Sequence, residues 1–212
     1  MIGRDGLTIA VPRGALLGGS LDLLDRLGYD TREIRENERR LIFPELGIVT
    51  MRPSDVPTYV EHGAADIGIT GKDVLLEQAE REVYELVDLG YGECRMVVAA
   101  RAGDDALEES LRRLGVARVA TKYPAIATRH FAATGRQAEI VEVKGSVEIA
   151  PLTGLVDAIV DLTATGTTLR ENNLVEHEQI EECTARLIAN PVSHKLKAGE
   201  IDALAARMRE AG

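Results

Sequence analysis

The sequence predicts an α/β fold of two lobes with mostly parallel sheets. Short runs of β-branched and apolar residues alternate with stretches of helical pattern, as in parallel sheets covered by helices. The 212 residues suffice for one large domain or two small ones, and 45% of them are hydrophobic. The stretch 95–175 has the pattern of a complete βαβαβ unit, so we assign residues 1–93 and 178–212 to lobe I and 94–177 to lobe II. A cleft between two such lobes is the expected binding site.

Turn and capping residues bound the elements of lobe I. Leu7–Val11 is predicted to be a buried strand that ends at Pro12-Arg13-Gly14. Ser20–Leu27 is predicted to be a helix, with Ser20 as its cap and Gly28 as its stop. The next elements in order are the strand Leu46–Met51, the helix Asp55–His62, the strand Ala65–Thr70 and a helix that opens at Gly71-Lys72-Asp73.

Lobe II begins with a continuous apolar strand, Arg95–Ala100. Alternating helices and strands follow in this order: Asp105–Leu114, Ala117–Thr121, Pro124–Ala133, Glu139–Val143, Ser146–Leu152 and Asp157–Leu162. The acidic stretch Glu176–Glu182 is predicted to be a solvated edge that leads back to lobe I. A short strand, Leu187–Ala189, and one C-terminal helix, Val192–Glu210, complete the chain.

The composition excludes several classes of protein. A net charge of −10 argues against general binding to nucleic acids or anionic membranes, and the lack of Trp leaves few platforms for stacking on bases. Two cysteines, Cys94 and Cys183, cannot make a disulfide scaffold, so a reduced, cytoplasmic chain is expected. No apolar run has the length of a transmembrane helix or a signal peptide. The four histidines show no metal-ligand spacing.

The stretch Asp157–Leu169, DAIVDLTATGTTL, carries the strongest chemical signal. A buried strand ends near Asp161, and a loop of small polar residues follows: Thr163, Ala164, Thr165, Gly166, Thr167 and Thr168. Glycine permits a tight turn, so successive backbone N–H groups and threonine hydroxyls can converge on one anion. The carboxylate of Asp161 is placed to accept hydrogen bonds from sugar hydroxyls, which predicts a site for a phosphorylated ribose. The alternative is an ordinary strand-to-helix turn rich in small residues.

The chain resembles the short form of ATP phosphoribosyltransferase, the catalytic subunit that opens histidine biosynthesis. Residues Glu148 through Leu169 nearly reproduce the signature of that family. Further matching stretches are Ile9–Leu16, Arg52–Asp73, Gly92–Ala99, Val119–Pro124 and Lys144–Pro151, so the resemblance covers essentially the whole chain. The sequence departs from the family pattern at Val156, where a small residue is usual, and at Ala15, where a second basic residue is often found.

The resemblance implies a two-lobed, periplasmic-binding-protein-like (type II) fold and the transfer of phosphoribosyl from phosphoribosyl pyrophosphate to N1 of ATP. It implies that Arg40 and Arg52 act on the leaving pyrophosphate. The residues implied to bind phosphoribosyl pyrophosphate are Glu148, Asp161, Thr163, Ala164, Thr165, Gly166, Thr167 and Thr168. Candidates for ATP contacts at strand and helix ends are Arg13, Gly14, Thr70, Gly71, Lys72 and Arg95. Mg²⁺ is expected with the pyrophosphate, with Glu148 and Asp161 as candidate ligands.

The resemblance also implies partners: a catalytic homodimer, and a separate regulatory subunit similar to histidyl-tRNA synthetase in a hetero-oligomer. Two other functions remain open at this point. One is a two-lobed solute-binding module without catalysis, which the pattern of Asp55–Thr70 also suits. The other is a phosphoribosyltransferase for another base, since the Thr/Gly loop concerns the donor and not the acceptor.

Overall fold

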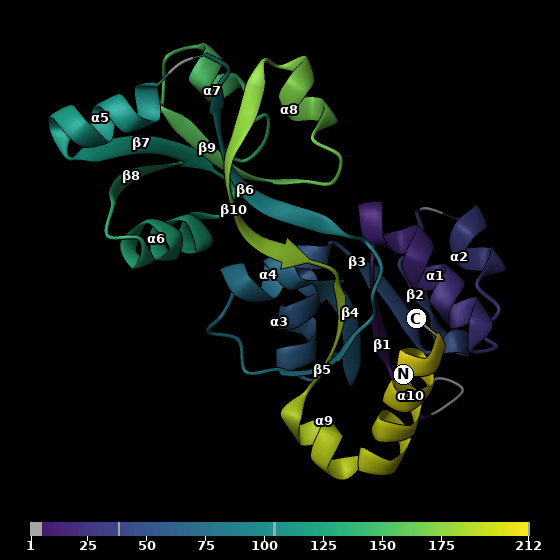
Figure 1. Cartoon of the computed structure of the whole chain (residues 1–212). Coiled ribbons are helices and arrows are strands. Elements are labelled where there is room, and N and C mark those ends of the chain that lie inside the picture. The colour runs from purple at the N-terminus through teal and green to yellow at the C-terminus, as the bar shows by residue number, and fades with distance from the viewer. Residues whose placement is uncertain (1–5, 38, 104, 212) are drawn as a thin grey trace. The chain divides into compact units, whose positions relative to one another are not determined.

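The structure, a computed structural model, describes residues 6–37, 39–103 and 105–211 (Figure 1). It has two compact α/β units, each built on its own sheet. Lobe I takes its described residues from Met1–Gly92 and Thr184–Gly212, and lobe II is Glu93–Cys183. The chain therefore returns to lobe I at residue 184, later than the position 178 expected from the sequence. No helix of the described residues combines the length and the apolar character needed to cross a membrane.

The sheet of lobe I has six strands in the order β2-β3-β1-β4-β11-β5. Their bounds are β1 Ile9–Pro12, β2 Ile42–Phe43, β3 Ile48–Met51, β4 Ile67–Gly71, β5 Tyr84–Asp88 and β11 Ala185–Ala189. The central strand β1 pairs in parallel with β3 and β4, whereas β2, β11 and β5 pair antiparallel with their neighbours. The sheet is thus mixed rather than mostly parallel, because β11 re-enters it from the opposite direction.

Helices cover both faces of this sheet because alternate residues of β1 point to opposite sides. Ile9 and Val11 join the larger core, to which α1 and α10 contribute, while Ala10 packs with α3 residues on the other face. The helices α1 and α10 also contact each other (Figure 1). The helical segments are α1 Leu17–Arg26, α2 Arg32–Glu36, α3 Val56–Glu61, α4 Lys72–Glu77, α9 Pro191–Leu196 and α10 Ala198–Ala211, with 3₁₀ turns at Gly14–Leu16, Pro44–Leu46 and Pro53–Asp55.

The predicted single helix Val192–Glu210 is wrong: it is divided into α9 and α10 at Lys197. Lys197 leaves the helical conformation, and its ammonium donates to both carboxylate oxygens of Asp66 at 2.9 Å and to the carbonyl of Gly6 at 3.0 Å. Asp66 in turn accepts from the backbone N–H of Thr8 at 2.8 Å. This partly buried ion pair joins the C-terminal helices to Thr8, which directly precedes β1.

The sheet of lobe II has five strands in the order β10-β6-β9-β7-β8. Their bounds are β6 Cys94–Arg101, β7 Val116–Thr121, β8 Gln137–Glu142, β9 Ala158–Thr163 and β10 Leu174–Cys183, and the helices are α5 Ala106–Leu114, α6 Pro124–Ala133, α7 Ile149–Leu152 and α8 Thr167–Glu171. The strands β9, β7 and β8 are parallel, with α6 and α7 in the connections, whereas β6 and β10 are antiparallel to their neighbours. This sheet is also mixed.

The acidic stretch Glu176–Glu182 is part of β10 and not only a solvated edge. The strand pairs with β6 from Leu174 to Cys183, with two irregularities between Glu176 and Glu181. Its glutamates lie at the edge of the sheet, where charge discourages pairing with another chain. The helix Pro124–Ala133 and the strand Asp157–Leu162 are confirmed, the strand being shifted by one residue.

The ion pair between Asp66 and Lys197 predicts a dependence of stability on pH. Burial raises the pKa of Asp66, but the hydrogen bonds from Lys197 and Thr8 outweigh burial and lower this pKa below its usual value. The stabilisation is therefore complete above the unfolded pKa and is lost as the pH falls through the lower, folded pKa. Replacing Asp66→Asn should lower the free energy of unfolding at pH 7 by about 2 kcal/mol and flatten its decline below about pH 4. Urea unfolding across pH checks this, and parallel pH profiles for the two proteins would contradict it.

Candidate functional site

A left-handed turn at Gly166 shapes the loop that follows β9. Gly166 has φ 71° and caps the short helix α8. Its N–H donates to the hydroxyl of Thr163 at 2.9 Å, and the hydroxyls of Thr165 and Thr167 lie 2.9 Å apart. The turn therefore folds the Thr/Gly segment back on itself, as the sequence predicts.

Part of the hydrogen-bonding capacity of this loop is already used within the loop. The hydroxyls of Thr163 and Thr165 accept from the N–H groups of Gly166 and Thr167, at 2.9 and 3.4 Å. No acceptor among the described residues bonds the N–H groups of Ala164, Thr165 and Thr168. These three N–H groups remain for an anion, and the side chains of Ala164, Thr165 and Thr168 are exposed.

Three charged residues that the sequence pattern does not assign to this loop lie beside it. Arg170 donates to the carbonyl of Thr165 at 2.9 Å and to the hydroxyl of Thr167 at 3.1 Å. A side chain at Gly166 would meet the guanidinium of Arg170 at 2.9 Å and the carboxylate of Glu176 at 3.3 Å. Glu176 accepts from Arg95 at 2.9 Å, so Arg95, expected near ATP, lies beside this loop.

Register explains the position of Arg95, because Arg95 of β6 pairs with Thr163 at the end of β9. Arg170 follows the turn glycine by four residues, which is the signal in the sequence that could have identified it. The contact between Glu176 and Gly166 depends on the pairing of β10 with β6 and has no local signal.

Asp161 lies on β9 just before the loop and is 8% exposed. Burial raises the pKa of its carboxyl, the N–H of Leu162 and the charge of Lys122 lower it, and the charge of Glu148 raises it. Burial prevails, and the pKa lies above its usual value. A hydroxyl-bearing ligand that donates to this carboxylate would replace the hydration that burial removes.

Glu148 is half-buried at the start of α7 and makes no capping hydrogen bond with its side chain. Its charge raises the pKa of Asp161, so the two carboxylates are near enough to interact. The described residues contain no group of three or more acidic, histidine or cysteine side chains arranged to hold a metal ion. Two carboxylates suit an ion such as Mg²⁺ that takes its other ligands from phosphate and water.

The parallel strands β1 and β3 of lobe I bring two of the predicted arginines together. Pro12 pairs with Met51, and the N–H of Arg13 donates to the carbonyl of Met51 at 2.7 Å. Arg13 and Arg52 follow these strands and line one pocket of 610 Å³. The other residues that line it are Leu41, Ile42, Val49, Thr50, Met51, Asp55 and Tyr59. Leu41, Ile42 and Tyr59 are 48–50% exposed, so the pocket offers apolar surface beside its two cations.

Two features make this pocket suitable for a polar ligand. No carboxylate of the described residues lies within ion-pair distance of Arg52, which is exposed. Thr50 is 4% exposed, and its hydroxyl has no hydrogen-bond partner among the described residues. A charged group and an unsatisfied hydroxyl thus lie at the same strand end.

Arg40 lies in a small neighbouring hollow that Arg13 and Thr50 also line. Its guanidinium forms an ion pair with Glu33, donates to the carbonyl of Ile42 at 2.9 Å and lies 5.1 Å from the centre of the Phe43 ring. The charge of Arg40 is therefore shared with a carboxylate, unlike that of Arg52.

The other predicted ATP contacts in lobe I lie at the ends of β1 and β4. Gly14 starts a 3₁₀ turn after β1 and is exposed. Thr70 is fully buried, and its hydroxyl donates to the carbonyl of Pro53 at 2.9 Å. Gly71 is the last residue of β4, and Lys72 pairs with Glu85 at 2.8 Å. Thr70 therefore supports the turn after Arg52 and is not at the surface.

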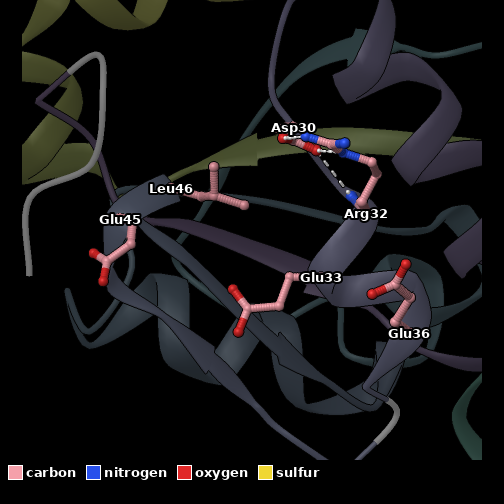
Figure 2. Close-up of a pocket in the computed structure, with 6 residues that line it drawn as sticks. All are labelled: Asp30, Arg32, Glu33, Glu36, Glu45 and Leu46. Atoms are coloured by element: carbon pink, nitrogen blue, oxygen red, sulfur yellow. Dashed lines mark hydrogen bonds and ion pairs between the residues drawn. The ribbon is translucent and has the colours of Figure 1, made fainter.

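A second hollow of lobe I, of 380 Å³, has the opposite electrostatic character (Figure 2). It is lined by Asp30, Arg32, Glu33, Glu36, Glu45 and Leu46. Its one arginine is bound by Asp30, as the dashed lines in Figure 2 show. The remaining carboxylates repel phosphate, so this hollow does not suit an anionic ligand.

Sequence comparisons with known proteins agree on one family. The model of the family described as ATP phosphoribosyltransferase matches residues 52–210. An ATP phosphoribosyltransferase of Rubrobacter xylanophilus is 53% identical over 210 residues, which cover 98% of this chain and 97% of that protein. One from Bacillus subtilis is 47% identical over 207 residues, which cover 95% and 93% of the two chains.

Solved structures agree with this result. The ATP phosphoribosyl transferase (HisG:HisZ) complex from Thermotoga maritima contains a chain with a TM-score of 0.81 and 36% identity, matched over 97% of this chain and 98% of that one. The periplasmic aliphatic sulphonate binding protein SsuA from Escherichia coli has a TM-score of 0.62 at 14% identity, over 97% of this chain and 72% of that one. The second likeness shows a shared two-lobed fold only.

Gly166 provides a direct test of the loop. Replacing Gly166→Ala should weaken binding of a phosphorylated ribose by about tenfold, because a side chain at this φ is strained and meets Arg170. The matched control is Gly154→Ala, since Gly154 has φ 72° but open space around it. Calorimetric titration should show normal binding for the control variant. Equal binding by both variants would contradict the assignment of the loop.

Proposed function

Because the chain belongs to the ATP phosphoribosyltransferase family, we propose a role in that family's reaction for each part of the site. The chain is a pentosyltransferase that catalyses the first step of histidine biosynthesis. It transfers phosphoribosyl from phosphoribosyl pyrophosphate to N1 of ATP and releases pyrophosphate. The two other functions that the sequence left open, a solute-binding module and a transferase for another base, no longer apply.

The chemistry of this reaction requires no nucleophile from the protein. The lone pair of adenine N1 attacks C1 of the ribose while the bond from C1 to pyrophosphate breaks. Positive charge develops on the ribose ring, and negative charge grows on the leaving pyrophosphate. The protein therefore accelerates the reaction by positioning both substrates and by stabilising these charges.

The loop Thr163–Thr168 is the proposed site of the donor's 5′-phosphate. The N–H groups of Ala164, Thr165 and Thr168 support this role, since they have no acceptor among the described residues. Arg170 adds positive charge where it bonds the carbonyl of Thr165. Asp161 is proposed to accept hydrogen bonds from the ribose hydroxyls, with Glu148 close enough to influence its charge.

Arg40 and Arg52 are proposed to stabilise the leaving pyrophosphate. A planar guanidinium can bind two phosphate oxygens at once. Arg52 has no carboxylate partner among the described residues, whereas Arg40 must exchange its ion pair with Glu33 for the phosphate. Arg52 is therefore expected to contribute more.

The proposed ATP contacts remain Arg13, Gly14, Gly71, Lys72 and Arg95, with Thr70 acting indirectly through the turn at Pro53. Arg13 has the best support, because it lines the same pocket as Arg52 beside exposed apolar side chains that a base can cover. Arg95 is not among the described residues that line that pocket, and its guanidinium bonds Glu176 next to the donor loop.

Mg²⁺ is proposed to enter with the pyrophosphate. Asp161 and Glu148 would hold it, together with oxygens of the substrate and water. When bound, the ion neutralises part of the pyrophosphate charge. The charge of Glu148 raises the pKa of Asp161, and this supports the role because a divalent cation would relieve the repulsion between the two carboxylates.

A regulatory subunit of the HisZ type is the proposed partner. The structure from Thermotoga maritima is of a complex of HisG with HisZ, and the matched chain of that complex aligns with 97% of this chain. We also propose a homodimer of the catalytic chain and a cytoplasmic location, the usual place of amino-acid biosynthesis.

The loop of lobe II carries the assignment of the donor site, and discrimination between acceptors tests the assignment of ATP. The purified chain should form phosphoribosyl-ATP from phosphoribosyl pyrophosphate and ATP, but no product with adenine, orotate or nicotinate. A product with a free base would contradict the assignment of ATP as acceptor.

Replacing Arg52→Ala should lower both kcat and kcat/KM by about 10²-fold, because the charge that it stabilises grows in the transition state. The matched control is Arg32→Ala, since Arg32 is exposed and bound to Asp30 in the acidic hollow. Steady-state kinetics of both variants check this. Normal turnover in Arg52→Ala would exclude the proposed role.

The isolated chain is expected to dimerise and to be insensitive to histidine, because feedback control is proposed to reside in the partner. Analytical ultracentrifugation followed by a histidine titration of activity checks both points. A monomer at micromolar concentration would count against the dimer. Strong inhibition of the isolated chain would place the regulatory site within it.

A further inference from the structure

The two cysteines of the chain face each other across neighbouring strands. Cys94 is the first residue of β6 and Cys183 is the last residue of β10. They are direct partners in the antiparallel ladder, one step beyond the pair formed by Arg95 and Glu182. Side chains of direct partners lie on the same face of a sheet. The chain has no other cysteine.

This register satisfies the main geometric requirement of a disulfide bond. Direct partners in an antiparallel pair have Cα atoms about 4.5 or 5.5 Å apart, depending on the kind of pair. Disulfides span Cα separations of about 4.4–6.8 Å. The ladder is regular here, since its irregularities lie between Glu176 and Glu181. The two thiols can therefore meet without a change of register.

The two cysteines lie at the boundaries of lobe II and differ in their exposure. Cys94 and Cys183 lie where β6 begins and β10 ends, next to the points at which the chain enters and leaves lobe II. Cys94 is partly exposed, whereas Cys183 is 1% exposed. A reagent in solution would thus react first with Cys94, and Cys183 would complete the bond.

We propose that Cys94 and Cys183 form a reversible disulfide by exchange with a low-molecular-weight disulfide, R–S–S–R. The Cys94 thiolate attacks one sulfur, forms a mixed disulfide and releases R–S⁻. The Cys183 thiolate then attacks Sγ of Cys94, forms the intramolecular bond and releases a second R–S⁻. Two electrons pass from the protein dithiol to the oxidant, and the two thiol protons go to water or to the released thiolates.

The bond would form close to the proposed donor loop. Arg95 follows Cys94 directly and pairs with Thr163, where the loop begins. The guanidinium of Arg95 bonds Glu176, whose carboxylate lies next to Gly166. Because Arg95 is the next residue in the chain, a bond at Cys94 would constrain the backbone that carries its guanidinium, so oxidation is expected to weaken donor binding. This consequence rests on the proposed function of the loop, whereas formation of the bond does not.

The native chain treated with oxidised glutathione tests the chemistry. We expect both thiols to disappear together, a peptide containing Cys94 to be linked to one containing Cys183, and dithiothreitol to restore both thiols. The variant Cys183→Ser should stop at a glutathione adduct on Cys94. Retention of both thiols in the wild-type chain, a stable glutathione adduct on it, or a bond between two chains would overturn the proposal.

Calorimetric titration with phosphoribosyl pyrophosphate then tests the coupling. The oxidised chain should bind about fivefold more weakly than the reduced chain, and reduction should restore the affinity. Equal affinity of the two forms would overturn the coupling. Failure of the reduced chain to bind would instead count against the proposed function of the loop, so the two results can be distinguished.

Discussion

The parallel pairing of β1 with β3 is the constraint on which the charged edge of lobe I depends. Because Pro12 pairs with Met51, Arg13 and Arg52 must follow their strands at the same edge of the sheet. The same holds in lobe II, because β9 and β7 are parallel. The Thr/Gly loop follows β9 and Lys122 follows β7, so both lie at the same edge of that sheet. Residues distant in the sequence are thus collected by strand direction rather than by local sequence.

An acidic chain that handles anionic substrates must separate its charges. The net charge is −10, yet the pocket with Arg13 and Arg52 contains one carboxylate residue, Asp55. The excess acid is found in places such as the hollow around Glu33 and Glu45 and along the edge strand β10. Local potential, and not net charge, therefore decides what this protein binds.

Elements whose ends are marked by nearby turn or capping residues could be predicted from the sequence. The helix Pro124–Ala133 has its proline and glycine signals, and the turn at Gly166 follows from the residues around it. The strands β2 and β5 are short or half-exposed and depend on partners elsewhere in the chain. Lys197, where the helix breaks, is bound by Asp66 from a distant part of the chain, and the position of Glu176 beside Gly166 depends on the pairing of β10. Such contacts leave no local pattern.

Hydrogen exchange of the backbone, with and without phosphoribosyl pyrophosphate, tests whether N–H groups of the loop after β9 hold the 5′-phosphate. We expect slower exchange at Ala164, Thr165 and Thr168 when the donor is bound, because the phosphate would then accept from these N–H groups. We expect little change around the acidic hollow at Glu33 and Glu45. Unchanged exchange in the loop under saturating donor would exclude it as the phosphate site.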